Sequence, residues 1–249
     1  MIVHPRLRQS FLEAKAIKII SGLNNFDTEK VLAVVKAAEV GGATFVDIAA
    51  DPDLVKLVRQ EISLPICVSA VEPQKFVKAV AAGADLIEIG NFDSFYAAGR
   101  YFGADEVLAI TKATRSLLPE ITLSVTVPHI LAADEQVKLA QNLVEAGADL
   151  IQTEGGTSSN PISPGVLGII EKAAPTLAAA YNISAAVSVP VICASGLSSA
   201  TIPMAIAAGA AGVGVGSAIN KLSDRVAMVA AVRSLVEALT STKYNKAKV

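Results

Sequence analysis

Polar residues and glycine stand at matching positions in four Gly-Ala segments of this sequence. Each first Gly is typical of a helix C-terminus that turns into a strand, and side chains along a strand alternate between its two faces. The segments are 42–47, 83–88, 147–152 and 209–214, and they end on Asp47, Glu88, Gln152 and Gly214. We therefore expect these four last residues to point the same way, so that two carboxylates and an amide share one environment.

We expect Lys18 to be the cation in that environment, because it is the only charged residue in the apolar run 16–22. Burying its ammonium among apolar side chains would cost free energy, so its side chain should face polar groups. Two carboxylates in one desolvated layer raise each other's pKa unless a cation lies between them. With Asp47 and Glu88, Lys18 could act in acid/base catalysis beside a carbonyl, or form a Schiff base if it is neutral. The alternative is a salt-bridged network that fills the core without catalysis.

Two further titratable residues follow predicted strands. Glu154 lies two residues beyond Gln152, on the same face and one layer nearer the strand end, where a substrate would lie. His129 follows Pro128 at the end of another strand, and histidine exchanges protons in the physiological pH range. We predict Glu154 and His129 as catalytic residues; for His129 the alternative is an incidental residue beside a loop.

A glycine-rich stretch at 208–218 predicts a phosphate site. Gly costs about 0.5–1 kcal/mol relative to Ala inside regular structure, so glycines at every second position imply the close approach of another group, of which phosphate is the simplest. Backbone N–H groups at a strand end that leads into a helix bind anions, and a Ser-Gly pair ends the preceding predicted strand. The expected phosphate ligands are Ser195, Gly196, Gly214, Gly216 and Ser217.

Eight strand patterns, each followed by a helical pattern, must position these residues. The predicted strands are 16–22, 44–50, 65–70, 86–90, 122–127, 150–154, 190–196 and 212–217; predicted helix starts include Asp51-Pro52, Pro73, and a cap at Ser198 or Ser199. Such alternation predicts a parallel sheet, and glycine starts on alternate strands favour a (β/α)8 TIM barrel over an open doubly wound sheet. We expect one domain over 1–249, a short helix at 6–15 that closes the bottom, and a frayed tail from 240.

Five aromatic residues gather in the segment 91–103, after the fourth predicted strand. The segment is longer than the two to six residues that such a connection usually needs. It could be a lid over the site or a partner surface. The alternative is that the rings pack beneath a partly helical loop.

Composition narrows the class of protein. The chain has 249 residues, 52% of them hydrophobic and 18% charged, with a net charge of −2, so we expect no nucleic-acid or membrane partner. Cys67 and Cys193 lie in apolar runs, which is typical of buried thiols in a reducing compartment. We expect a cytoplasmic protein, or a stromal one in plastids, that can form homo-oligomers. No His or Cys spacing predicts a metal site, although carboxylates could hold Mg2+ with help from a substrate.

The last quarter of the chain resembles the phosphate-binding half of ribulose-phosphate-binding and thiazole-synthase-like barrels. The resemblance rests on Cys193–Gly196 and on Ala208–Ala218. In those families the corresponding segments hold the phosphate of a sugar phosphate or of a flavin, which makes FMN a possible cofactor. The resemblance does not identify a reaction.

Nearly the whole chain resembles the family of hypothetical chloroplast reading frame twenty-three and its cyanobacterial relatives. The resemblance rests on segments at predicted strand ends: Lys18–Asp27, Phe45–Pro52, Ile89–Asp93, Ser124–His129 and Gln152–Ser158. It implies a fold and a photosynthetic source, and it supplies no catalytic residues.

Three hypotheses follow. The first is an isomerase, epimerase or lyase that acts on a small phosphorylated sugar or sugar-derived metabolite by proton transfer or Schiff-base chemistry. The second is an FMN-binding oxidoreductase, and the third is a non-catalytic binding or regulatory barrel. Exposed rings in 91–103 with no pocket above Lys18 would favour the third.

Overall fold

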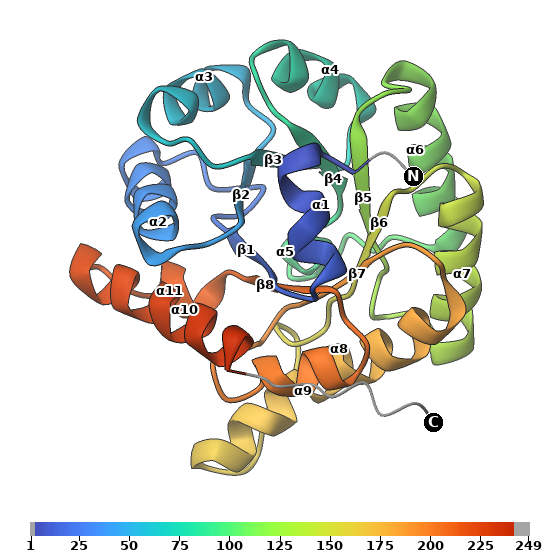
Figure 1. The fold of residues 1–249 in the computed structure, drawn as a ribbon. Coiled ribbons are helices and arrows are strands. Elements are labelled where there is room, and N and C mark those ends of the chain that lie inside the picture. The colour runs from blue at the N-terminus through green and yellow to red at the C-terminus, as the bar shows by residue number, and fades with distance from the viewer. Residues whose placement is uncertain (1–2, 242–249) are drawn as a thin grey trace.

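Eight parallel strands close into a barrel in the computed structural model, which describes residues 3–241. Neighbouring strands pair in chain order and β8 pairs with β1, so the (β/α)8 prediction is confirmed (Figure 1). The strands are β1 (Ala16–Ile20), β2 (Phe45–Ala49), β3 (Ile66–Ala70), β4 (Leu86–Ile89), β5 (Thr122–Thr126), β6 (Leu150–Gln152), β7 (Val191–Ala194) and β8 (Gly212–Val215). The helices are α1 (Pro5–Leu12), α2 (Thr28–Gly41), α3 (Pro52–Glu61), α4 (Pro73–Ala81), α5 (Asp93–Tyr96), α6 (Ala104–Leu117), α7 (Ala133–Glu145), α8 (Gly165–Ala186), α9 (Ile202–Ala207), α10 (Ser217–Asn220) and α11 (Arg225–Thr240).

The predicted elements differ from the observed ones mainly at their ends. Several predicted strands extend one or two residues beyond the C-terminal end of the observed strand. The first of these extra residues often keeps a backbone hydrogen bond to the neighbouring strand, as Ser21 and Val127 do, before the chain enters the loops above the barrel. Asp51 caps α3 as expected, accepting hydrogen bonds from two backbone N–H groups. The predicted serine cap of α9 is wrong: Thr201 precedes the helix, and Ser198 starts the turn before it. Most of the expected frayed tail, from residue 242 onward, lies outside the described residues.

The lower part of the barrel interior is apolar. Inward side chains of six strands form this layer: Ala16, Phe45, Cys67, Leu86, Leu150 and Ile192. Helix α1 crosses the N-terminal mouth and packs Leu7 and Phe11 onto the layer (Figure 1), with the Phe11 and Phe45 rings 6.2 Å apart in an edge-on arrangement. The prediction that the first helix closes the bottom of the barrel is therefore confirmed.

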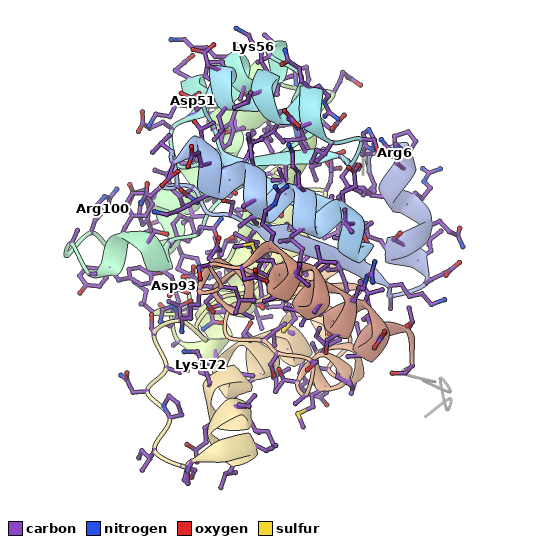
Figure 2. The ribbon with its side chains drawn as sticks, turned by 90° about the vertical axis from the view of Figure 1, so that its left-hand side faces the viewer. Arg6, Asp51, Lys56, Asp93, Arg100 and Lys172 are labelled. Atoms are coloured by element: carbon purple, nitrogen blue, oxygen red, sulfur yellow. The ribbon has the colours of Figure 1, made fainter. Side chains whose placement is uncertain are left out.

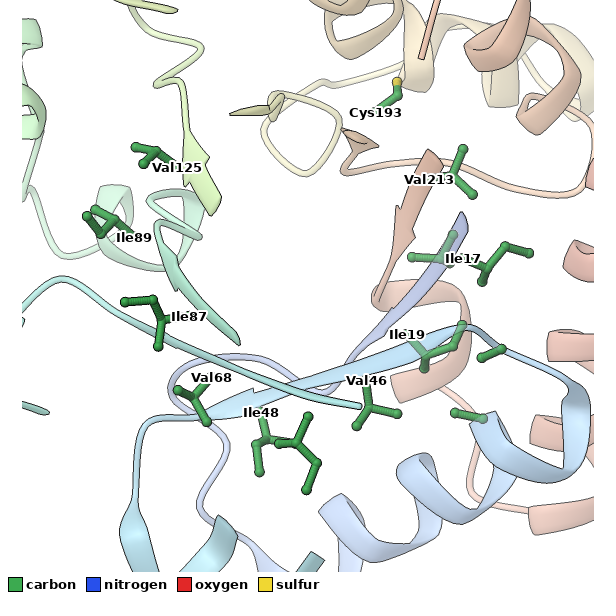
Figure 3. Packing of buried hydrophobic residues seen from close by; sticks show 14 of the residues in the cluster. Ile17, Ile19, Val46, Ile48, Val68, Ile87, Ile89, Val125, Cys193 and Val213 are labelled. Carbon is green, nitrogen blue, oxygen red and sulfur yellow. The ribbon is translucent and has the colours of Figure 1, made fainter. Parts of the chain in front are cut away.

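The outer faces of the strands carry the main hydrophobic core. Ile17, Ile19, Val46, Ile48 and Val213 are buried between the barrel and the surrounding helices (Figure 3). These residues alternate along their strands with inward-facing ones. Because Ile17 and Ile19 face the helices, the residue between them must face the barrel interior.

The repeated Gly-Ala-Asp segments have a structural role at the lower end of the barrel. Gly42, Gly83, Gly147 and Gly209 all have a positive φ, between 89° and 113°, as expected for glycines at helix ends. Asp85 and Asp149 follow two of them and bind Arg59 and Arg115 respectively. Each arginine also donates to the carbonyl of the glycine two residues before its aspartate. The repeat thus ties α3 to the start of β4 and α6 to the start of β6.

Candidate functional site

A charged cluster that we call the floor lies inside the barrel, directly above the apolar layer. It consists of Lys18, Asp47 and Glu88, and the side chains of all three are fully buried. Lys18 Nζ lies 2.6 Å from Glu88 Oε2 and 3.9 Å from Asp47 Oδ2. The predicted meeting of the ammonium with the two carboxylates is thus observed.

The floor keeps Lys18 protonated. Burial alone lowers the pKa of Lys18, but the charges of Glu88 and Asp47 outweigh it and raise that pKa above its ordinary value. Burial also raises the pKa of Asp47, while Lys18 opposes that rise and Glu88 adds to it. A Schiff base needs a neutral amine that a substrate can reach. The structure offers neither at Lys18, so the Schiff-base role is not supported.

Neutral side chains complete the hydrogen bonding of the floor. Ser69 Oγ donates to Asp47 Oδ1 at 2.6 Å, and Ser124 Oγ donates to Glu88 Oε2 at 2.9 Å. Gln152 Nε2 donates to Glu88 Oε1 at 2.7 Å, so the expected column of polar residues does converge. Asn91 covers the cluster, with its Nδ2 3.3 Å from Asp47 Oδ2 and its φ at 61°.

A cavity of about 200 Å³ lies above the floor, at the C-terminal mouth of the barrel. Active sites of (β/α)8 barrels lie at this mouth. Residues from the β1, β4, β6, β7 and β8 ends line it: Ile20, Ser21, Gly22, Asn91, Asp93, Ser94, Gln152, Thr153, Glu154, Thr157, Ala194, Ser195, Gly196, Gly216, Ser217 and Asn220. The three floor residues are absent from this lining. Figure 2 shows Asp93, which lines this cavity, and Arg6 on opposite sides of the molecule. Arg6 belongs to α1, the helix that closes the N-terminal mouth of the barrel.

A second titratable cluster, which we call the rim, consists of Asp93, His129 and Glu154. Glu154 is only 4% exposed, and its Oε1 lies 3.3 Å from His129 Nδ1 and accepts a hydrogen bond from Tyr96 Oη at 2.5 Å. Asp93 Oδ1 lies 3.5 Å from His129 Nδ1. Ser158 and Ser195 donate to Asp93 at 2.8 and 3.1 Å. The structure thus brings the predicted residues His129 and Glu154 together.

Two of the rim residues, Glu154 and His129, hold protons more tightly than the same groups do in water. Burial raises the pKa of Glu154, and the Asp93 charge adds to this, although hydrogen bonds from His129 and Tyr96 oppose it. The hydrogen bond to Glu154 raises the pKa of His129. Burial and Glu154 raise the pKa of Tyr96, so its phenol stays protonated and donates. A carboxyl at a cavity wall that is hydrogen-bonded to an imidazole behind it has the properties of an acid/base pair.

The aromatic segment supplies part of the rim. Phe92 and Phe102 are buried, with ring centroids 4.6 Å apart and ring planes tilted by 35°. Tyr96 lies in the short helix α5 with its ring 5.2 Å from the His129 ring. The packing alternative is thus the observed one. Asp93, Tyr96 and Asn91 were missed as site residues, although their position directly after a predicted strand could have indicated them.

The predicted phosphate ligands occupy two different environments. Ser195, Gly196, Gly216 and Ser217 line the cavity. Gly214 does not, and a Cβ on it would lie 2.8 Å from Ala194 Cβ and 3.4 Å from Gln152 Oε1. The close approach expected there is therefore that of neighbouring side chains, which corrects its prediction as a phosphate ligand.

Backbone packing holds the β7 end of the cavity wall. Ser195 and Gly196 have φ values of 78° and 74°, and a Cβ on Gly196 would lie 2.7 Å from Gly156 Cα. Among residues 3–241, the backbone N–H groups of Gly196 and Ser217 have no hydrogen-bond acceptor. Two free donors thus border the cavity at the ends of β7 and β8.

The rim could also hold a divalent cation. One ligand atom from each of its three residues lies within 4.8 Å of the other two, and one imidazole with two carboxylates suits several divalent metals. Sequence spacing predicted no metal site because the three residues follow three different strands. A flavin fits the cavity less well, since pockets for drug-sized ligands usually measure about 300–1,000 Å³.

Together, the closed parallel strands and the polar cavity at their C-terminal ends define a (β/α)8 barrel with a polar cavity at its C-terminal mouth. The chain belongs to the family described as "Protein of unknown function (DUF561)", whose model matches residues 2–245. It is 42% identical over 245 residues to "Uncharacterized protein ycf23" of Porphyra purpurea, covering 98% of this chain and 92% of the relative. The protein of the same name from Cyanophora paradoxa is 48% identical over 219 residues, covering 87% and 89%. The predicted family is thus confirmed.

Solved structures share the fold at low sequence identity. A 3-hexulose-6-phosphate synthase superposes with a TM-score of 0.64 at 19% identity, covering 90% of this chain and 99% of the other. The (S)-3-O-geranylgeranylglyceryl phosphate synthase of Thermoplasma acidophilum, in complex with sn-glycerol-1-phosphate, has a TM-score of 0.62 at 15% identity, covering 96% and 98%. At such identities the likeness establishes the fold. Within residues 3–241, no helix combines the length and apolarity needed to cross a membrane.

Proposed function

We propose that this protein is an enzyme that moves a proton on a small phosphorylated metabolite, as an isomerase, epimerase or lyase. One observation carries the proposal. A single cavity has free backbone N–H donors on one wall and, on another, a buried carboxyl that is hydrogen-bonded to a histidine. The donors are the N–H groups of Gly196 and Ser217, and the carboxyl is that of Glu154.

The β7 and β8 ends are the proposed phosphate wall. Phosphate sites of (β/α)8 barrels are built frequently from the loops after strands 7 and 8. Here the N–H groups of Gly196 and Ser217 lie in those loops and have no acceptor in the part of the chain that the structure describes. Neighbours with the same fold are described as acting on phosphorylated compounds. The cavity, about 200 Å³, suits a small metabolite better than a flavin.

Glu154 is the proposed proton carrier, and His129 its partner. Glu154 lines the cavity, and its raised pKa brings its proton affinity closer to the range in which a general base is effective. Lys18, Asp47 and Glu88 lie below the cavity lining. We assign to them the positioning of cavity groups and a fixed local charge, in place of direct contact with the substrate.

Phosphate binding is tested by calorimetric titration of the wild type with inorganic phosphate and with phosphorylated three- to six-carbon sugars. Gly216→Asp should abolish binding, because it places a carboxylate on the proposed wall. Gly216→Ala is the matched control and should retain binding, since it adds no charge and its Cβ, 3.3 Å from the Ile20 carbonyl oxygen, needs a shift of only a few tenths of an ångström. A wild type that binds none of these compounds contradicts the proposal.

Proton transfer is tested by deuterium exchange into the bound compounds, followed by NMR in D2O. Glu154→Gln should slow exchange by about 100-fold or more, the usual contribution of a general base. Lys18→Met that still folds should slow it less, because Lys18 does not reach the cavity. Equal exchange in wild type and Glu154→Gln would contradict the role of Glu154.

A metal-dependent enzyme is the second candidate, favoured by the arrangement of the rim. In that case Asp93, His129 and Glu154 would hold Mg2+ or another divalent ion. Calorimetric titration of the apo protein with Mn2+ and Mg2+ distinguishes the two candidates. Binding that His129→Ala abolishes would support the metal.

The partner and location assignments remain predictions. Self-association is supported by exposed apolar side chains at and before α8, which projects from the body of the barrel (Figure 1): Ile162, Val166, Leu167 and Tyr181. Light scattering on the purified chain tests it. A cytoplasmic or stromal location is tested by imaging the tagged protein in the source cell.

A further inference from the structure

The strongest unexplained feature of the cavity is an oxygen without a partner. Gln152 is 2% exposed and lines the cavity, yet among the described residues no hydrogen-bond donor reaches its Oε1. A buried acceptor without a donor costs more free energy than one that is paired. The oxygen is therefore a position at which a ligand would gain by supplying a donor.

The floor fixes the orientation of this amide. Gln152 Nε2 donates to Glu88 Oε1 at 2.7 Å and to Thr126 Oγ1 at 3.2 Å. An ionised carboxylate only accepts hydrogen bonds, so the amide cannot turn its oxygen toward Glu88. Lys18 Nζ forms an ion pair with the other oxygen of Glu88 at 2.6 Å. Through the contacts from Lys18 to Glu88 and from Glu88 to Gln152, the amide nitrogen of Gln152 is held, and its amide oxygen has no hydrogen-bond donor among the described residues.

We infer that Gln152 Oε1 receives a hydroxyl group of the ligand, and that the floor selects hydroxylated phosphate compounds over their alkyl counterparts. This inference rests on the proposed function, which places the phosphate at the β7 and β8 ends of the same cavity. Gln152 Oε1 lies below those ends, 3.4 Å from the position that a Cβ on Gly214 would take. The N–H donors of Gly196 and Ser217 suit an anion, and Gln152 Oε1 suits a proton donor. The ligand class is a small phosphorylated polyol or sugar with a free hydroxyl beyond its phosphate ester.

The test compares matched probes by calorimetric titration. Glycerol phosphate is compared with propyl phosphate, ribose 5-phosphate with pentyl phosphate, and inorganic phosphate is the reference. In the wild type, at least one hydroxylated probe should bind about tenfold or more tightly than its alkyl counterpart, because the alkyl chain leaves the buried acceptor unpaired. Gln152→Leu, or Gln152→Met if that variant does not fold, should reduce this preference to about threefold or less while inorganic phosphate binds as before.

Two results would overturn the inference. One is equal binding of both members of each pair to the wild type. The other is a preference that survives in the Gln152 variants, since the hydroxyl would then be recognised elsewhere. In both cases the binding of inorganic phosphate shows that the proposed function still stands. Failure of the wild type to bind any phosphate compound would instead contradict the proposed function itself.

Discussion

The floor and the rim are both clusters of charged side chains in one barrel, but they differ in access to the cavity. Lys18, Asp47 and Glu88 are fully buried and belong to strands. Of the rim residues, Asp93 and Glu154 line the cavity, and all three follow strand ends. The difference separates charged groups that a ligand in the cavity could touch from charged groups that lie below it. Changes at the floor should therefore act on stability, and changes at the rim on binding and proton transfer.

Removing the floor cation should have the largest effect. Lys18→Met leaves two buried carboxylates without their counter-ion, and breaking a buried pair costs about 3–5 kcal/mol. Chemical denaturation measures the loss. Lys15→Met is the control, because the Lys15–Glu13 pair is exposed and such pairs contribute about 1 kcal/mol or less. If the two variants lost similar amounts of unfolding free energy, the prediction that the buried pair contributes more than the exposed one would be wrong.

The cavity wall should show the next largest effect. Gly196→Ala and Gly99→Ala share a φ near 75°, but a Cβ on Gly196 meets the Gly156 backbone whereas one on Gly99 meets nothing within 4 Å. We expect about 1 kcal/mol of destabilisation for Gly99→Ala and about 2–4 kcal/mol for Gly196→Ala. Denaturation measures both. Phosphate binding should be lost only at Gly196, and its retention there would count against the proposed wall.

At the rim, Tyr96→Phe removes a hydrogen bond to Glu154 but leaves the ring. Hydrogen bonds to charged groups contribute about 1.5–3 kcal/mol to stability. Because Tyr96 is only half-buried, we expect Tyr96→Phe to lower the unfolding free energy by an amount near the lower end of that range. Tyr101→Phe serves as the control, because Tyr101 is exposed. If the rim is the reacting site, Tyr96→Phe should also shift the pH profile of deuterium exchange, which a purely structural tyrosine would leave unchanged.

The smallest effect should be the pH dependence that His129 gives to stability. Its pKa is raised in the folded protein, chiefly by the hydrogen bond to Glu154, so its contribution is complete below about pH 6.5 and is lost as the pH rises through the raised value. The unfolding free energy of the wild type minus that of His129→Gln should therefore be larger at pH 6 than at pH 8.5. Denaturation at both pH values measures it, and a difference of opposite sign would contradict the assigned ion pair with Glu154.

Sequence periodicity by itself determined the barrel and the inward direction of its charged residues. Ile17 and Ile19 flank Lys18, and the repeated glycine starts place Asp47, Glu88 and Gln152 on one face, because strand alternation is a local property of the backbone. Gly214 was misinterpreted, since its close neighbours belong to adjacent strands whose distance from it no local pattern encodes.

Only the tertiary structure decided how deep each charge lies and which loop residues meet. Lys18 lies beneath the cavity, Gln152 at its wall, and Asp93, Tyr96, His129 and Glu154 come together from the ends of three strands. Depth depends on the register between neighbouring strands and on the conformations of long loops. Both are set by contacts between residues far apart in the chain, which sequence spacing does not reveal.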